Sequence, residues 1–141
     1  MAVVTKNIKL RSRGETDIID ITDQVSACVS DSKIKDGIVT VFVSGSTAGL
    51  TTIEFESGLV KDLKQSFEVI APRRGEYHHN LRWQDGNGFS HVRAAMLGPS
   101  LSIPFNNKRL ALGTWQQIVF IDFDNRPRSR EVVVQIIGEQ E

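Results

Sequence analysis

The chain has 141 residues, of which 40% are hydrophobic and 24% are charged, an ordinary balance for one globular domain spanning residues 1–141. The formal net charge of +0 provides no overall positive field that would attract nucleic acid or an acidic membrane surface. The single Cys28 excludes an internal disulfide framework and a cysteine-built zinc cluster. Without a signal peptide or the ~20 consecutive apolar residues of a membrane helix, the chain is expected in the cytoplasm.

The first elements predicted along the chain are two strands and a helix. Residues 3–11 have apolar side chains on one parity and form the first strand, and Asp17–Ile21 form a second, shorter one. Thr22 is suited to cap a helix whose apolar stripe includes Val25 and Val29.

A second strand pair and a longer helix follow. Gly37–Val43 is the clearest strand, because its β-branched and aromatic residues suit the centre of a sheet. A polar link leads to a strand at Leu50–Phe55, after which Ser57 can cap an amphipathic helix. We expect that helix to end at Pro72.

The remaining chain begins as a polar loop from Tyr77 and ends in strands. Ser90 can cap a short helix, His91–Leu97, which the following Gly-Pro pair stops. Four strands are predicted after it: 101–105, 109–112, 115–123 and 131–137. This order predicts an α+β fold with a mixed, largely antiparallel sheet, two main helices, one short helix and a strand-rich C-terminal third.

A glycine-rich run precedes the last predicted helix and is a candidate anion site. Gly86, Asn87 and Gly88 can turn backbone N–H groups toward a ligand, and a helix start adds unpaired N–H groups and a positive dipole end. His91 and Arg93 would lie in the first turn, where cations do not help an isolated helix but suit a bound phosphate. The alternative is a plain Gly-rich turn before a capped helix.

All three histidines lie between Tyr77 and His91, which raises the possibility of a metal site. His79 and His91 could bind a divalent ion such as Zn or Mg together with oxygen ligands from Asp85 or Glu54. Adjacent His78 and His79 point apart on an extended segment, so only one would face a site. The alternatives are solvated loop histidines, or proton carriers, because imidazole titrates near neutral pH.

Two other polar segments are compatible with phosphate contact. Ser44–Gly49 follows the best strand and offers hydroxyl groups and flexible backbone, but its spacing matches no serine hydrolase motif. Arg126, Arg128 and Arg130 form a basic turn after two aspartates, which is either solvated with local ion pairs or in contact with phosphate. Neither patch has the regular aromatic interleaving expected of a nucleic-acid surface.

Seven segments carry a resemblance to a known family, in the family's order and over nearly the whole chain: Asp36–Val43, Gly45–Glu54, Tyr77–Asn80, Asp85–Ala94, Leu97–Leu101, Leu112–Gln117 and Asp122–Arg128. With these segments the chain resembles the YjbQ-like proteins, members of which are described as having a secondary thiamine-phosphate synthase activity. The sequence departs from the family's pattern at Gly49, where a second Ala is expected.

The resemblance implies a structure and a set of site residues. The structure would be an α+β subunit with a mixed sheet, assembled as a homotrimer whose sheets pack around a threefold axis. The positions that match the family's polar motifs are His79, Asp85, Asn87, His91 and Arg93, together with Glu54, Thr114, Gln116 and Arg126.

The resemblance also implies a transferase reaction. A pyrimidine carried on a diphosphate would be joined to a thiazole phosphate with release of diphosphate, aided by cationic groups or a divalent metal. His79, His91 and Glu54 would be catalytic, and the partner would be a phosphorylated small molecule, with no nucleic acid and no membrane. The alternatives are a non-catalytic trimer that binds metal or phosphorylated metabolites, and a metal-dependent hydrolase in which His79 and His91 converge.

Overall fold

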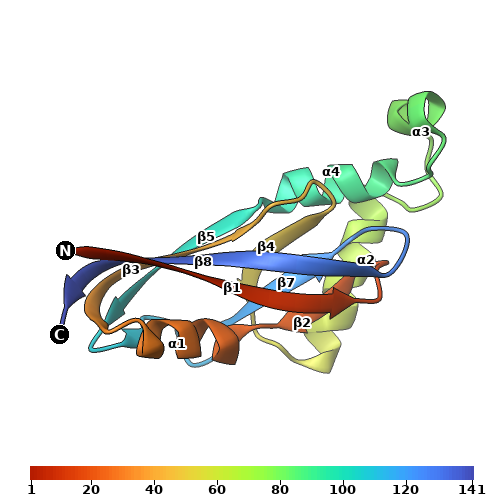
Figure 1. The fold of residues 1–141 in the computed structure, drawn as a ribbon. Coiled ribbons are helices and arrows are strands. Elements are labelled where there is room, and N and C mark those ends of the chain that lie inside the picture. Colours follow the sequence, from red (N-terminus) through yellow and green to blue (C-terminus); the bar gives the residue numbers. More distant parts are fainter.

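Two antiparallel β-sheets form the body of the computed structural model, which describes all residues from 1 to 141 (Figure 1). The larger sheet has five strands, in the spatial order β1 (Ala2–Ser12), β8 (Arg128–Gln140), β3 (Ile34–Val43), β5 (Ser100–Asn106) and β6 (Arg109–Leu110). The smaller sheet has three, in the order β2 (Asp17–Asp20), β7 (Gln117–Asp122) and β4 (Ala48–Ile53). The α+β prediction is confirmed, although the expected single sheet is divided in two.

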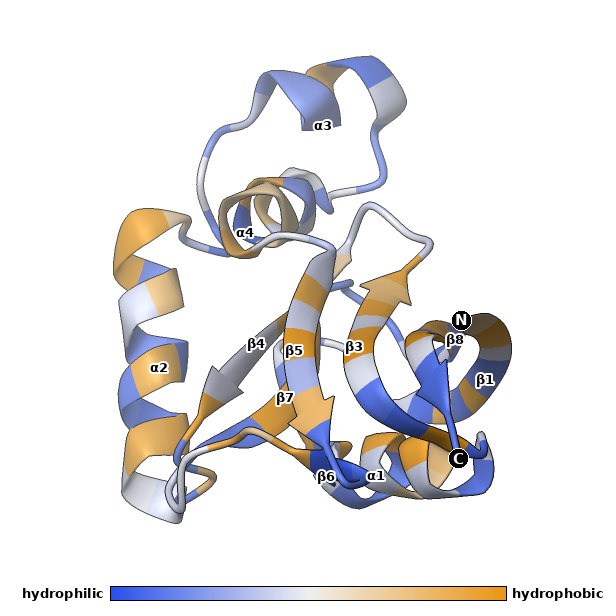
Figure 2. Ribbon diagram, turned by 90° about the vertical axis from the view of Figure 1, so that its left-hand side faces the viewer, coloured by the Kyte–Doolittle hydropathy of each residue, from blue (hydrophilic) through white to orange (hydrophobic).

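Four helices surround the sheets: α1 (Thr22–Asp31), α2 (Ser57–Ile70), α3 (His78–Trp83) and α4 (Gly88–Leu97). Figure 2 shows α2 on the left beside β4 and β7, and β8 and β1 on the right, on the side of the molecule opposite α2. Helix α1 closes one end of the space between the sheets, α4 lies at the other end, and α3 stands out beyond α4. None of the four has both the length and the apolar composition that a bilayer-spanning helix requires.

Strand β7 is the centre of the core, because both of its faces are covered. Ile118 and Phe120 point between the two sheets, whereas Val119 and Ile121 point toward α2, and all four side chains are fully buried. Alternation of side chains across a strand sends neighbours to opposite faces, so a run without polar interruptions suits a strand covered on both sides.

Two of the expected helix caps differ in the structure. The side chain of Glu56, not Ser57, accepts hydrogen bonds from N–H groups of the first turn of α2. A carboxylate at this position also interacts favourably with the positive end of the helix dipole. The hydroxyl of Thr22 donates to Asp20 instead of capping α1, whose N-cap residue is Ile21.

The loop expected from Tyr77 contains helix α3, and α4 begins at Gly88 instead of His91. Ser90 therefore lies inside α4, fully buried, and its hydroxyl donates to the carbonyl of Phe123. The polar sequence of α3 obscured this helix, because its residues show no apolar stripe of the usual helical period. The structure thus has two short helical segments where one was predicted.

The strands of the smaller sheet have other bounds than expected, since β2 and β7 are shorter and β4 lies two residues earlier. Strand β4 ends at Ile53 and β7 begins at Gln117, so Glu54 and Trp115 lie outside the sheet. Trp115 is 73% exposed, and the prediction that it belongs to a strand is wrong. The backbone turns at 113–116, where the Gln116 side chain accepts a hydrogen bond from the N–H of Gly113, and this turn removes Trp115 from the ladder.

Replacing Phe120 with Ala is expected to lower the free energy of unfolding by about 3–5 kcal/mol, because its fully buried ring fills the space between the sheets. Urea denaturation followed by circular dichroism measures the change. The matched control is Phe55→Ala, where the ring is 44% exposed, and it should cost less than about 1 kcal/mol. Equal losses in the two variants would contradict the placement of β7 at the centre of the core.

Candidate functional site

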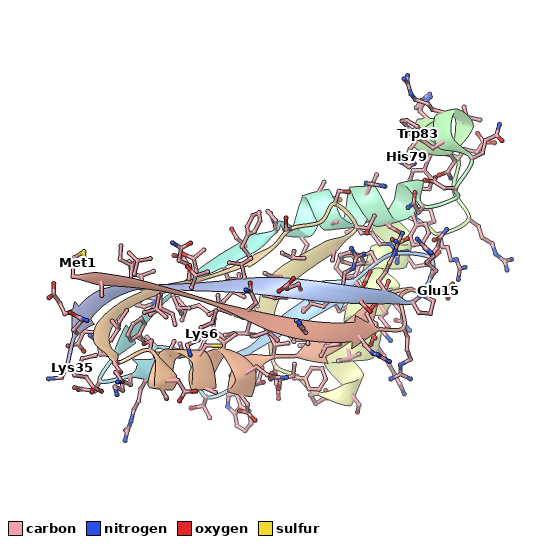
Figure 3. All side chains as sticks on the ribbon, viewed as in Figure 1. Met1, Lys6, Glu15, Lys35, His79 and Trp83 are labelled. Carbon is pink, nitrogen blue, oxygen red and sulfur yellow. The ribbon has the colours of Figure 1, made fainter.

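The structure brings His79 of α3 and His91 of α4 into contact. Their ring centroids are 4.3 Å apart and their planes are inclined by 38°. Figure 3 shows His79 on α3, at the end of the molecule opposite Met1. Asp85 completes the group, with its Oδ1 3.5 Å from Nδ1 of His79. That separation is too long for a hydrogen bond, so the buried Nδ1 atom has no partner in the chain.

The environment of His91 favours the neutral imidazole. Burial lowers its pKa below the ordinary value of histidine, because the charged form loses hydration, and the proximity of His79 lowers the pKa further. The carboxylates of Asp85 and Asp124 oppose this shift without cancelling it. At neutral pH His91 is therefore suited to accept a proton or to bind through a free ring nitrogen. His78, by contrast, is exposed, as the sequence predicted.

Three asparagine side chains hold the loop between α3 and α4. Asn80 Oδ1 accepts a hydrogen bond of 2.8 Å from the N–H of Gly88. The hydrogen-bond network assigns the amide of Asn87 with its nitrogen toward Asp85, donating to the two carboxylate oxygens at 2.9 and 3.1 Å. Asn125 donates to the backbone carbonyl of Asp85 at 2.8 Å. Together these bonds place the Asp85 carboxylate beside the histidines.

The backbone geometry of this loop requires glycine at both Gly86 and Gly88. Gly86 has φ +69°, a left-handed conformation that side chains disfavour. A Cβ atom at Gly88 would lie 2.6 Å from Cβ of Tyr77, closer than real Cβ atoms approach, so this glycine lets α4 start against α3. The Gly88 N–H is bonded to Asn80, and the anion site predicted for Gly86, Asn87 and Gly88 remains a prediction.

The fully buried carboxylate of Asp122 connects three strands. Asp122, at the end of β7, accepts from Arg130 of β8 through Nε at 2.8 Å and Nη2 at 3.0 Å. The hydroxyl of Ser12, at the end of β1, donates to the same carboxylate at 2.6 Å. A buried ion is tolerated only when its partners replace the lost water, and this two-point guanidinium contact with a hydroxyl does so.

A second buried carboxylate lies two residues further along. Asp124 is 1% exposed and accepts from Nε of Arg128 at 2.8 Å and from the hydroxyl of Thr47 at 3.2 Å. Burial alone would raise the pKa of Asp124, but the N–H of Asn125 and the Arg128 guanidinium outweigh burial and hold the pKa below its usual value. Of the three arginines in the predicted basic turn, only Arg126 is left exposed.

The hydrogen bonds of Arg93 are made to residues outside the histidine pair. Its side chain is 4% exposed, and it donates from Nε to the carbonyl of Ala71, from Nη1 to Thr16 and from Nη2 to Glu68, at 2.8–2.9 Å. Its donors therefore link α4 to the end of α2 and to the turn after β1. These bonds use three of its five N–H donors, and the phosphate contact expected of Arg93 remains a prediction.

Glu54, Thr114 and Gln116 lie at the opposite end of the smaller sheet from the histidines. The pair Ile53–Gln117 marks that end, whereas Asp122 pairs with Ala48 at the other, five residues away along each strand, or roughly 17 Å. The Gln116 amide donates to the hydroxyl of Thr52 at 3.0 Å, and Glu54 is exposed. One chain therefore does not bring these three residues to the candidate site.

The donor set at the site does not form a complete protein-built metal centre. A structural or catalytic zinc ion takes three or four protein ligands at about 2.0–2.3 Å. His79, His91 and Asp85 do not meet this requirement, since no group of three or more His, Cys, Asp or Glu side chains in the chain is arranged to hold a metal ion. Metal binding at these residues therefore remains a prediction.

Several residues that shape the site were not singled out from the sequence. Asn80 and Asn125 each act through a hydrogen bond to the backbone, and their positions in the sequence form no recognisable motif. In the sequence Asp122 and Asp124 are neighbours of a basic turn, but their position at the end of an apolar strand indicates burial. Carboxylates that follow a buried strand need partners, and Arg128 and Arg130, on one parity of the next strand, supply them.

Comparison with known proteins gives a consistent result. The family model described as UPF0047 protein YjbQ-like matches residues 6–139. A UPF0047 protein of Archaeoglobus fulgidus is 38% identical over 130 residues, covering 92% of this chain and 98% of that protein. The UPF0047 protein YugU of Bacillus subtilis is 31% identical over 135 residues, covering 94% and 98%.

Solved structures agree with the fold. The crystal structure of a YbjQ-like protein from Sulfolobus solfataricus has a TM-score of 0.93 at 33% identity and covers 98% of this chain and 99% of that one. A YjbQ/UPF0047 protein from Clostridium acetobutylicum has a TM-score of 0.86 at 34% identity, covering 94% and 99%. This agreement over nearly the whole length shows that the chain shares its overall fold with these proteins.

The titration of His91 tests the geometry of the histidine pair. We expect its midpoint, measured by NMR of the imidazole Cε1–H group, to lie below that of an ordinary histidine and to rise in His79→Ala, because both burial and the neighbouring imidazole are reduced. His78→Ala, which removes an exposed histidine one position away, should leave the midpoint unchanged. The same shift in both variants, or in neither, would contradict the contact.

Proposed function

The chain belongs to the YjbQ-like UPF0047 family, and we propose that its His79–His91 pair binds a phosphorylated small molecule and catalyses the transfer that the family resemblance implies. In that reaction a pyrimidine is transferred from its diphosphate to a thiazole phosphate. The observation that supports the proposal is the convergence of two imidazoles and a carboxylate, held on two helices by side-chain amides. Of these groups His91 has a pKa lowered by burial, and titratable groups with shifted pKa values concentrate at functional sites.

The histidines can supply a proton to the leaving group of this transfer. The bond between carbon and the diphosphate oxygen breaks, a bond between that carbon and the thiazole forms, and diphosphate leaves with the electron pair. Asp85 faces Nδ1 of His79, which leaves Nε2 on the opposite side of the ring to meet the ligand. A proton at Nε2 can then neutralise charge on the leaving oxygen, as in general acid catalysis. The proton leaves with the diphosphate, and neutral His91, in contact with His79, can relay the next proton from water to His79.

Product formation from the two purified precursors, supplied with Mg²⁺ because phosphates normally carry it, tests the proposal. His79→Ala and His91→Ala are each expected to lower kcat by about 10²–10⁴, the usual contribution of general acid–base catalysis. His78→Ala should stay close to the unaltered protein, because this exposed histidine contacts neither ring.

Absence of product from the unaltered protein would contradict the transfer. A thermal shift with the same precursors would then separate two cases, because a ligand at 100 times its Kd adds about 2.7 kcal/mol of stability. A shift that His91→Ala abolishes would favour the non-catalytic binding protein. Equal turnover in all three histidine variants would remove the pair from the mechanism. Release of phosphate from either precursor alone would instead favour hydrolysis.

We also propose that three copies assemble through the outer face of the larger sheet. Val3, Ile137, Ile38 and Pro104 lie side by side across four strands, and the first three are 55%, 42% and 46% exposed. No helix covers this face (Figure 2). An uncovered apolar row of this kind is typical of a protein interface, and the net charge of +0 does not oppose self-association.

Light scattering is expected to give the mass of three chains, and Ile137→Asp is expected to give one, because a carboxylate would be buried without a partner at the interface. Val69→Asp, on the outside of α2 at 83% exposure, is the control and should keep the larger mass. A monomeric unaltered protein, or dissociation by both substitutions, would contradict assembly through this face.

A further inference from the structure

Strand β1 leaves one side of its backbone without a partner. It is an outer strand of the larger sheet and pairs with β8 from Ala2 to Ser12, so its other edge faces no strand. Figure 2 shows β1 at the right-hand side of the molecule, with no helix or strand beyond it. With 11 residues it is the longest free edge, since β6, β2 and β4 have two, four and six. Free N–H and C=O groups along such an edge can pair with another extended chain.

The free edge of β1 is also regular. Its pairing with β8 runs without a bulge, and the strand contains neither proline nor glycine, which are features that commonly prevent a further strand from adding to an edge. Positive charge is the protective feature that β1 does have, because it carries Lys6, Lys9 and Arg11, and no acidic residue precedes Glu15 in the chain. Pairing of β1 with β1 of a second copy would bring these cations together without an anion, which opposes self-association along this edge.

The positive charge near the end of β1 is not neutralised within the chain. Lys9 and Arg11 are exposed, and the ion pairs of the chain include neither of them. A hollow of about 430 Å³ lies on this part of the sheet, lined by Lys9, Leu10, Arg11, Ser129, Arg130 and Glu131. Arg130 is already paired with Asp122, and Glu131 is the only carboxylate in that lining. This end of β1 therefore offers both space and uncompensated positive charge for an acidic side chain.

The alternation of side chains along β1 defines which segment would fit. Lys9 and Arg11 lie on one face, two residues apart, whereas Leu10 between them is half-buried against the core on the other face. An added strand would follow the same alternation, with two acidic side chains beside the cations and an apolar one beside Leu10. A nucleic acid could also contact the cations, but its phosphodiester backbone has no N–H groups for the free carbonyls of the strand. The edge therefore favours a peptide.

We propose that the free edge of β1, from Asn7 to Ser12, binds an extended acidic segment of another protein as an added strand, with its carboxylates facing Lys9 and Arg11. This surface does not include the histidine pair. It is also separate from the apolar row through Val3, which lies six residues from Lys9, or roughly 20 Å along the strand. The proposal is therefore independent of the small-molecule ligand and of the face through which three copies assemble.

Fluorescence anisotropy with a labelled peptide, Thr-Glu-Val-Glu-Val-Glu-Thr, tests this proposal. We expect it to bind about tenfold or more tightly than the same peptide with proline in place of each valine, which keeps the charge but loses N–H donors of the ladder. Hydrogen exchange should slow at the amide groups of residues 7–12 when the first peptide is bound. No binding, equal affinity of the two peptides, or binding without this protection would overturn the added strand.

Charge substitutions test which residues of the edge take part. Lys9→Glu combined with Arg11→Glu should weaken binding of the acidic peptide about tenfold or more and create affinity for Thr-Lys-Val-Lys-Val-Lys-Thr, and this gain shows that the altered protein is folded. Lys61→Glu combined with Lys64→Glu changes the net charge equally at exposed positions of α2 and should alter neither affinity. Equal weakening by both pairs of substitutions would contradict a site on β1.

Two other occupants of the edge would give different results. An oligothymidine of the same charge that binds as tightly as the acidic peptide would favour a nucleic-acid surface. Slow exchange of the outward amide groups of residues 7–12 in the protein without peptide would show that a second copy already covers the edge. Either result would overturn the proposal.

Discussion

The fully buried carboxylate of Asp122 is the constraint on which this end of the molecule depends. A charge at that depth is stable only with partners, and its partners come from two other strands, Ser12 at the end of β1 and Arg130 near the start of β8. Asp124 repeats the arrangement with Arg128 and Thr47. The two carboxylates therefore fix where four strands end, and the loops that leave those strands start from defined positions.

The candidate site is built on that frame through a few further bonds. Phe123, between the two aspartates, accepts a hydrogen bond from Ser90 of α4, and Asn125 binds the backbone of Asp85. The helix that carries His91 and the loop that precedes it are thus attached to the same strand end. Arg130 also donates to the hydroxyl of Thr47, so the guanidinium that neutralises Asp122 holds the turn before β4 as well.

Side chains of the same type have different roles because the fold buries them differently. His78 and His79 are adjacent, yet only His79 contacts His91, since a helix turns neighbouring residues by about 100°. Arg93 was grouped with the site from its place in a polar motif, but its three hydrogen bonds join α4 to α2 and to the turn after β1. Glu54 and Gln116 share that motif pattern and lie at the far end of a strand pair. A motif match shows which residue types are shared, but it does not show how far apart those residues lie in the structure.

The sequence by itself determined the number and order of the strands, the α+β class, the family and the concentration of polar chemistry between Tyr77 and His91, because each of these depends on local pattern or on order along the chain. Helix α3, the starts of α2 and α4, and the division into two sheets were decided by tertiary structure. Glu56 capped a helix that Ser57 was expected to cap, and Ser90 was buried by a contact 33 residues away. The pairing of the histidines, and of Asp122 with Arg130 and Ser12, likewise joins residues 8 to 110 positions apart, and periodicity within a segment carries no information about such distances.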